Sequence, residues 1–154
     1  MYETIIWATD GSELADGALP FALALAERDD AELVVLHINE VTPGRAGGYP
    51  VLTDEAEIRP QLEARVERLR DAGVSARFEV VTALGESVPS AIAQVAEQDA
   101  GDLIVIGTHG RGTVGSLVHG NVTRRLVHLA ACPVLAVPVG RLAAQTNNVP
   151  VAFG

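Results

Sequence analysis

The sequence contains no lysine, so all 11 of its basic residues are arginines. This absence excludes a P-loop of the form G-x-x-x-x-G-K-[ST], in which the lysine reaches the phosphates. It also excludes any mechanism that proceeds through a lysine Schiff base. Cys132 is the single cysteine, and the chain can therefore form neither an internal disulfide nor a cysteine-rich zinc site.

Aromatic residues are also scarce, with three Phe, two Tyr and one Trp, whereas 48% of the 154 residues are hydrophobic. The core is therefore expected to consist of Ala, Val, Leu and Ile. No apolar run reaches the roughly 18 residues of a membrane-spanning helix, and no charged-then-apolar leader opens the sequence. We expect a cytoplasmic protein without a membrane partner, with one domain over residues 1–140 and a loose tail over residues 141–154.

Acidic residues are missing from the last third of the chain. Residues 103–154 contain four arginines and no acid, so this part has a charge of +4 against −13 for the remainder, which together make the net −9. The negative total argues against nucleic acid or an anionic membrane as a partner. The asymmetry favours an anion site in the last third. The alternative is that the asymmetry arises by chance in a chain with Glu-rich helices.

Short β-branched runs alternate with longer helical stretches. The predicted strands are residues 4–9, 32–38, 74–81, 103–106 and 133–137. Helices are predicted up to Glu27, with a kink or late start at Pro20, then up to Ala72 with Pro60 in the first turn, after Gly85, and over residues 121–130. Residues 39–53 have the glycine and proline content of a surface loop. Apolar strands in the order βαβαβαβαβ predict an α/β fold, an open doubly wound five-stranded parallel sheet with helices on both faces.

Two loops of this predicted sheet are candidates for a ligand site. Ligands of open α/β sheets lie beyond the carboxyl ends of the strands, where the winding reverses, and residues 8–12 and 107–123 follow the first and fourth strands. The glycines of the second loop would let backbone N–H groups approach an anion. The helix that begins near Gly120 adds free N–H donors. A glycine-rich turn with an ordinary helix cap is the alternative.

The sequence contains the glycines of a dinucleotide-binding fingerprint but not the acidic residue that this fingerprint requires. Gly110, Gly112 and Gly115 form G-x-G-x-x-G, but no acid follows Asp102. A dinucleotide site requires an acidic residue about 20 residues downstream, to bind the ribose. The pattern therefore does not predict an NAD site.

Several patterns in register resemble the universal stress protein family. Gly107, Gly110 and Gly120 match the G-x2-G-x9-G motif of its nucleotide-binding branch. The remaining matches are Asp10-Gly11-Ser12 after the first strand, Leu36-His37-Ile38 in the second, and Cys132-Pro133-Val134-Leu135 at the last. Together they cover residues 2–138. One departure is Asn121, which stands where the motif has Ser or Thr.

The resemblance implies a stress-response regulator that binds ATP or another adenine nucleotide, with Mg²⁺ held through the phosphates and Asp10 as a candidate neighbour. It assigns the nucleoside to Ala8, Thr9, Asp10 and Ile38, the ribose and phosphates to Gly107, Thr108, Gly110 and Arg111, and the phosphates to Gly120, Asn121, Val122 and Thr123. It also implies a homodimer joined through the last strand, residues 133–139.

Two alternatives remain open: a nucleotide-free interaction module of the same fold, and an enzyme such as a slow ATPase. The enzyme is disfavoured because the loops supply no base, nucleophile and orienting residue together. His109 is interpreted as a loop residue and His37 as a hydrogen-bonded structural residue, and His119 and His128 lack a third zinc ligand. Ser12 is predicted to cap the first helix.

Overall fold

The computed structural model describes residues 1–41, 55–108 and 119–138. These residues contain a five-stranded sheet in the order β3-β2-β1-β4-β5, in which every neighbouring pair is parallel. The strands are β1 (Thr4–Ala8), β2 (Glu32–Val41), β3 (Ala76–Leu84), β4 (Leu103–Thr108) and β5 (Val134–Pro138). The predicted open doubly wound sheet is confirmed.

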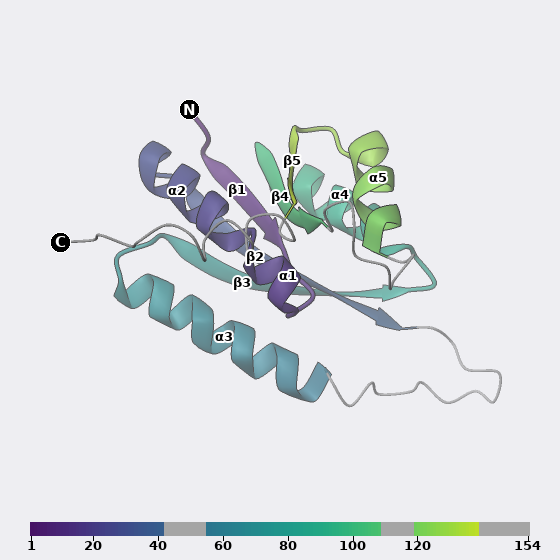
Figure 1. Ribbon diagram of the computed structural model, residues 1–154, viewed down its shortest axis with the longest axis horizontal. Coiled ribbons are helices and arrows are strands. Elements are labelled where there is room, and N and C mark those ends of the chain that lie inside the picture. Colours follow the sequence, from purple (N-terminus) through teal and green to yellow (C-terminus); the bar gives the residue numbers. More distant parts are fainter. Residues whose placement is uncertain (42–54, 109–118, 139–154) are drawn as a thin grey trace.

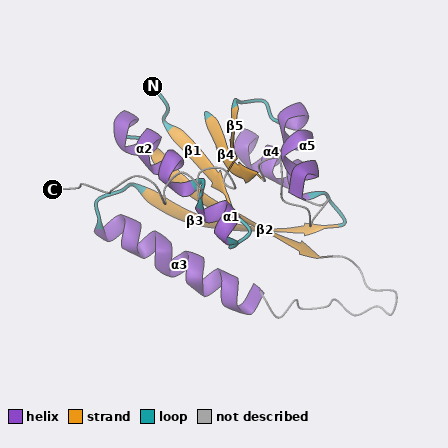
Figure 2. Cartoon of the chain, in the orientation of Figure 1, coloured by secondary structure: helices purple, strands orange, loops and turns teal. Residues whose placement is uncertain are grey.

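Helices cover both faces of the sheet (Figures 1 and 2). They are α1 (Glu13–Asp16), α2 (Leu19–Asp29), α3 (Glu55–Asp71), α4 (Val88–Gln98) and α5 (His119–Leu129). Buried residues of α2 and α3 join one core cluster, and those of α4 and α5 join the other. The described helices contain none that is long and apolar enough to cross a membrane.

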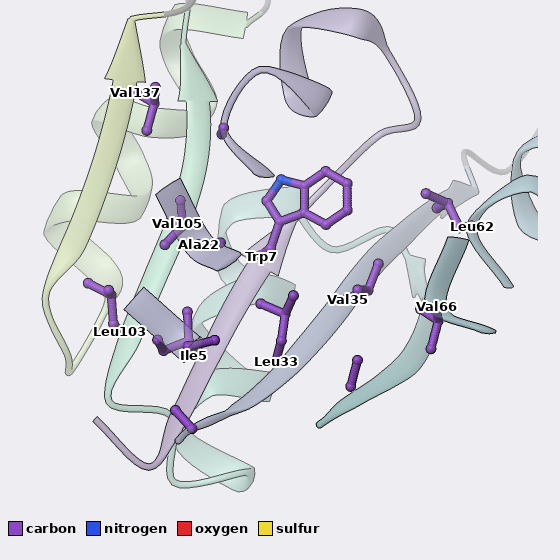
Figure 3. Close-up of a cluster of buried hydrophobic side chains, with 14 residues drawn as sticks. Ile5, Trp7, Ala22, Leu33, Val35, Leu62, Val66, Leu103, Val105 and Val137 are labelled. Atoms are coloured by element: carbon purple, nitrogen blue, oxygen red, sulfur yellow. The ribbon is translucent and has the colours of Figure 1, made fainter. Parts of the chain in front are cut away.

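The central strand shows why the sequence folds this way. Ile5 and Trp7 point into the cluster under α2 and α3, whereas Ile6 and Ala8 point into the cluster under α4 and α5. Successive side chains of a strand face opposite sides, so a strand covered on both faces is apolar throughout. Figure 3 shows Trp7 surrounded by aliphatic residues, which confirms the predicted composition of the core.

The segment predicted as one helix up to Glu27 is two helices. Ser12 caps α1, as predicted, and its Oγ accepts a hydrogen bond from the Ala15 N–H at 3.3 Å. The helix α1 ends at Asp16 with Gly17 as its C-cap, and α2 begins at Leu19 with Pro20 in its first turn. Proline lacks an N–H but suits the first turn, where that donor has no helical partner. Of the two predicted effects of Pro20, the structure shows the late start.

Two loop and helix boundaries were predicted wrongly. Residues 39–41 were assigned to a loop, but β2 continues to Val41 because it pairs with the far end of β3. Pro60 lies inside α3, which begins at Glu55, and not in its first turn. Burial of Leu62 and Val66 against the sheet stabilises this helix, since tertiary packing contributes more to helix stability than propensity does.

The strand β3 is displaced along the sequence from its prediction. It begins at Ala76, not at residue 74, and it runs to Leu84. Gly73 has a φ of 90° directly after α3, which confirms the predicted left-handed end of this helix. The Val74 N–H donates to the Leu69 carbonyl and so belongs to that helix end. The predicted tail, residues 141–154, lies outside the described residues.

Candidate functional site

The winding of the sheet reverses between β1 and β4. The chain proceeds from β1 to β2 and β3 on one side and then crosses to β4 and β5 on the other. A cavity of about 220 Å³ lies at this point, at the carboxyl ends of β1, β2 and β4. Its described lining consists of Ala8, Thr9, Asp10, Ser12, Leu14, Ala15, Leu36, Ile38, Glu40, Val88, Ile92, Ile106, Gly107, Thr108 and Val122.

The walls of the cavity are mostly apolar. Leu36, Ile92 and Ile106 belong to the core cluster under α4 and α5, with Ile38 and Val122 packed against it. Polar groups enter from the strand ends and from the turn before α1. An apolar pocket with a few converging polar groups is the pattern of a small-molecule site.

The turn between β1 and α1 is held by its own side chains. The Thr9 hydroxyl accepts a hydrogen bond from the Gly11 N–H at 3.1 Å, and the Asp10 carboxylate accepts one from the Ser12 N–H at 2.9 Å. Gly11 has a φ of 80°, a left-handed conformation that favours glycine. These contacts place Thr9, Asp10 and Ser12 at the edge of the cavity in a defined conformation.

Gly107 has a structural role that its motif did not indicate. A Cβ at this position would collide with the Leu14 carbonyl oxygen and lie 3.3 Å from the Ala15 Cα. The backbone of α1 therefore packs directly on the end of β4, and only glycine leaves room for it. Gly107 also lines the cavity, so the residue on which α1 packs is itself part of the site.

His37 lies on β2, beneath the turn that follows β1. Its side chain is only 3% exposed. Its Nδ1 is 2.9 Å from the Thr9 carbonyl oxygen and its Nε2 is 2.7 Å from Glu55 Oε1. The prediction of a hydrogen-bonded structural histidine is confirmed.

The structure brings many of the predicted site residues together around this cavity. Those on its lining are Ala8, Thr9, Asp10, Ile38, Gly107, Thr108 and Val122. Gly110 and Arg111, together with His109, lie outside the described residues. Gly120 belongs to the first turn of α5.

The remaining predicted residues of α5 lie apart from the described lining. Asn121 is exposed and is the third residue of α5. The Thr123 Oγ1 is buried and has no hydrogen-bond partner among the described residues. Arg124 and Arg125 are exposed on the same helix.

Sequence reasoning missed part of the lining. The missed residues are Leu14, Ala15, Leu36, Glu40, Val88, Ile92 and Ile106. A period of two would have found some of them, because Leu36, Ile38 and Glu40 share one face of β2. The order of β3 and α4 places the N-terminal end of α4 at the carboxyl edge of the sheet, but no local signal showed that Val88 and Ile92 line the cavity.

The electrostatics of the cavity combine two signs. The N-terminal ends of α4 and α5 contribute lining residues Val88 and Val122, and a helix N-terminus carries a partial positive charge. Asp10 and Glu40 add carboxylates. Within the described ranges, no group of three or more His, Cys, Asp or Glu side chains is arranged to hold a metal ion.

Comparisons with known proteins agree with this architecture. The sequence profile of the universal stress protein family matches residues 1–138. A Thermus aquaticus universal stress protein, from the QAH/OAS sulfhydrylase 3′ region, is 36% identical over 137 residues, which cover 89% of this chain and 99% of that protein.

Solved structures show the same fold. A Burkholderia pseudomallei protein of the universal stress protein family is 31% identical, with a TM-score of 0.72 over 89% of this chain and 96% of that one. The universal stress protein of Archaeoglobus fulgidus in complex with dAMP is 22% identical, with a TM-score of 0.64 over 89% of this chain and 98% of that one.

Proposed function

The chain belongs to the universal stress protein family, and from this membership and the cavity we propose that it binds an adenine nucleotide, ATP among them. In this proposal it acts as a homodimeric stress-response regulator. The observation that carries the proposal is the apolar cavity at the reversal point of the sheet, bounded by polar groups at the strand ends. This is the place at which open α/β sheets bind nucleotides.

Each part of a nucleotide has a matching part of the cavity. The flat faces of the adenine ring suit the aliphatic side chains of Leu36, Ile38 and Ile92, and the Asp10 carboxylate suits a ribose hydroxyl. The Archaeoglobus fulgidus protein supports the proposal, since its structure shows that this fold can hold dAMP. The phosphates would lie toward Thr108 and the start of α5.

The charges of the site favour a nucleotide bound with Mg²⁺. Asp10 and Glu40 would repel bare phosphates, but Mg²⁺ binds well to one or two carboxylates together with phosphate oxygens. A partial positive charge at the N-terminus of α5 and the absence of acids after Asp102 add attraction for the phosphates. The metal would therefore arrive with the nucleotide, held by its phosphates.

The homodimer is proposed from the edges of the sheet. The outer strands are β3 and β5. Arg77 and Glu79 place charges on β3, whereas β5 has none, and an uncharged edge strand tends to pair with another chain. Pairing of β5 with its copy across residues 133–139 would cover that edge.

The first test asks what the purified chain carries and binds. The chain is denatured, any released nucleotide is identified by mass spectrometry, and the emptied protein is refolded and titrated with Mg-ATP and AMP by calorimetry. We expect saturable binding of at least one of them. No released nucleotide and no heat of binding would leave the nucleotide-free interaction module as the function.

A matched pair of variants on α5 locates the binding site. Val122→Phe enlarges a lining residue and should abolish binding by filling the cavity, whereas Val127→Phe makes the same change at a side chain that is 55% exposed. Nucleotide affinity should survive in Val127→Phe. Equal affinities in the two variants would place the nucleotide elsewhere.

A further inference from the structure

The helix α3 contributes no residue to the described lining of the cavity, yet it contacts the segment that forms one wall. This segment, residues 9–16, is called the β1–α1 segment below. Ile58 and Arg65 of α3 contact the segment directly, and Glu55 reaches it through His37. The three residues lie three and seven positions apart and so share one face of the helix. The contacts of α3 therefore follow the segment from one end to the other.

Arg65 holds the far end of the segment. Its Nη1 and Nη2 donate to the two carboxylate oxygens of Asp16 at 2.5 and 3.0 Å, a bidentate arrangement that fixes orientation as well as distance. The same guanidinium lies 5.9 Å from the centre of the Trp7 ring, and the Trp7 Nε1–H donates to the Ala15 carbonyl at 3.1 Å. Ala15 lines the cavity, so Arg65 acts on the wall through Asp16, the neighbour of Ala15 in the chain.

His37 and Glu55 hold the near end. A carbonyl oxygen can only accept, so the contact with Thr9 requires the proton on His37 Nδ1. The Nε2 then faces Glu55 Oε1 at 2.7 Å with one proton between them, carried either by the imidazolium or by the carboxylic acid. Glu55 thus orients the ring that holds the Thr9 carbonyl.

The middle of the segment is held by packing. A Cβ added to Gly11 would come within 3.0 Å of Ile58 Cγ2, which shows how closely α3 approaches the turn. Ile58 therefore lies against the turn and limits its movement toward α3. The turn cannot move away without breaking the contacts of Thr9 and Asp16.

We propose that Glu55 and Arg65 of α3, with His37, are positioning residues for the ligand cavity, so that ligand affinity depends on polar pairs that lie outside it. The inference rests on the proposed nucleotide binding and adds to it the helix that controls the site. Removing either pair frees the β1–α1 segment, and the ligand must then order the segment again when it binds.

The test is a calorimetric titration with Mg-ATP or AMP, whichever the unaltered chain binds more tightly. Arg65→Met and Glu55→Ala should each bind about 2- to 30-fold more weakly, the range found for residues that act on a site without touching the ligand. Glu55→Gln should restore affinity, because its amide N–H can donate to a neutral His37 Nε2. Asp16→Asn removes the carboxylate that pairs with Arg65, and it replaces Arg65→Met as the test variant if Arg65→Met does not fold.

Val66→Ala is the matched control on the same helix. Val66 is 1% exposed and packs in the core, so its truncation should lower the melting temperature while leaving the affinity unchanged. Weakened binding in this control, equal to that of Arg65→Met, would show a general effect of stability and overturn the proposal.

The outcomes separate this proposal from the one on which it rests. If the unaltered chain binds neither nucleotide, both proposals fail. If it binds and both Arg65→Met and Glu55→Ala bind equally well, only the positioning role of α3 fails. Failure of Glu55→Gln to recover the loss of Glu55→Ala would overturn the route through His37.

Discussion

Replacing Gly107 by Ala tests whether α1 can pack on the end of β4 only when the residue there has no side chain. The added methyl group would collide with the Leu14 carbonyl oxygen and lie 3.1 Å from the Leu14 carbonyl carbon. Both are backbone atoms of a helix, which cannot move aside as a side chain can. Accommodating the methyl group therefore requires α1 to shift away from the sheet, together with the lining residues Leu14 and Ala15.

The expected cost is that of overpacking a core, about 1–3 kcal/mol of unfolding free energy. For a chain of this size the melting temperature changes by about 2–4 °C per kcal/mol, which predicts a decrease of about 2–12 °C. Because α1 also supplies part of the cavity wall, nucleotide affinity should fall in the same variant. Thermal unfolding followed by circular dichroism and a calorimetric titration measure the two effects.

Gly101→Ala is the control, because it makes the same change before the other end of β4. A Cβ there would come within 2.7 Å of Ile6 Cδ1, the end of a side chain, and would lie 3.3 Å from the Ala96 carbonyl oxygen. Gly101 is not part of the described lining of the cavity. We expect a smaller loss of stability and no change in affinity. If Gly107→Ala melts at the same temperature as the unaltered chain, the close packing of α1 on β4 is wrong. If it loses stability but keeps its affinity, α1 does not shape the site.

Three further predictions concern assembly, turnover and acid sensitivity. Light scattering should give twice the 16.1 kDa of one chain, and Ala136→Arg should yield monomers. Ala136 is chosen because it is exposed on β5, whereas the neighbouring Leu135 also packs against the core. ATP hydrolysis should be slower than about 1 per second, the low end of typical enzymes, and faster steady-state phosphate release would favour the enzyme. The Glu3 and Thr4 N–H groups donate to Asp102 and lower its pKa, so its stabilising effect is present above about pH 4 and is lost as the pH falls. Asp102→Asn should therefore lower the melting temperature at pH 7, and the difference from the unaltered chain should shrink as the pH falls below about 4. A difference independent of pH would contradict this role.

The architecture could be predicted because it depends on local patterns. Runs such as Ile5-Ile6-Trp7-Ala8 are apolar on both faces and alternate with helical stretches, and few arrangements other than a doubly wound parallel sheet cover them. The ends of elements were harder to predict. The extension of β2 to Val41 depends on its pairing with β3, a strand that lies far along the sequence.

The sequence by itself determined the family resemblance, the sheet and the loops that meet at its carboxyl edge, because glycines, short apolar runs and the absence of lysine are readable one segment at a time. Only the tertiary structure decided how those loops are held. Gly107 was predicted as part of a ligand turn, and its contact with Leu14 became visible only when α1 was placed on β4. The contact of His37 with Glu55 and that of Asp16 with Arg65 join residues 18 and 49 positions apart. No local pattern encodes such pairs, because they form only when α3 crosses the sheet beside the turn that follows β1.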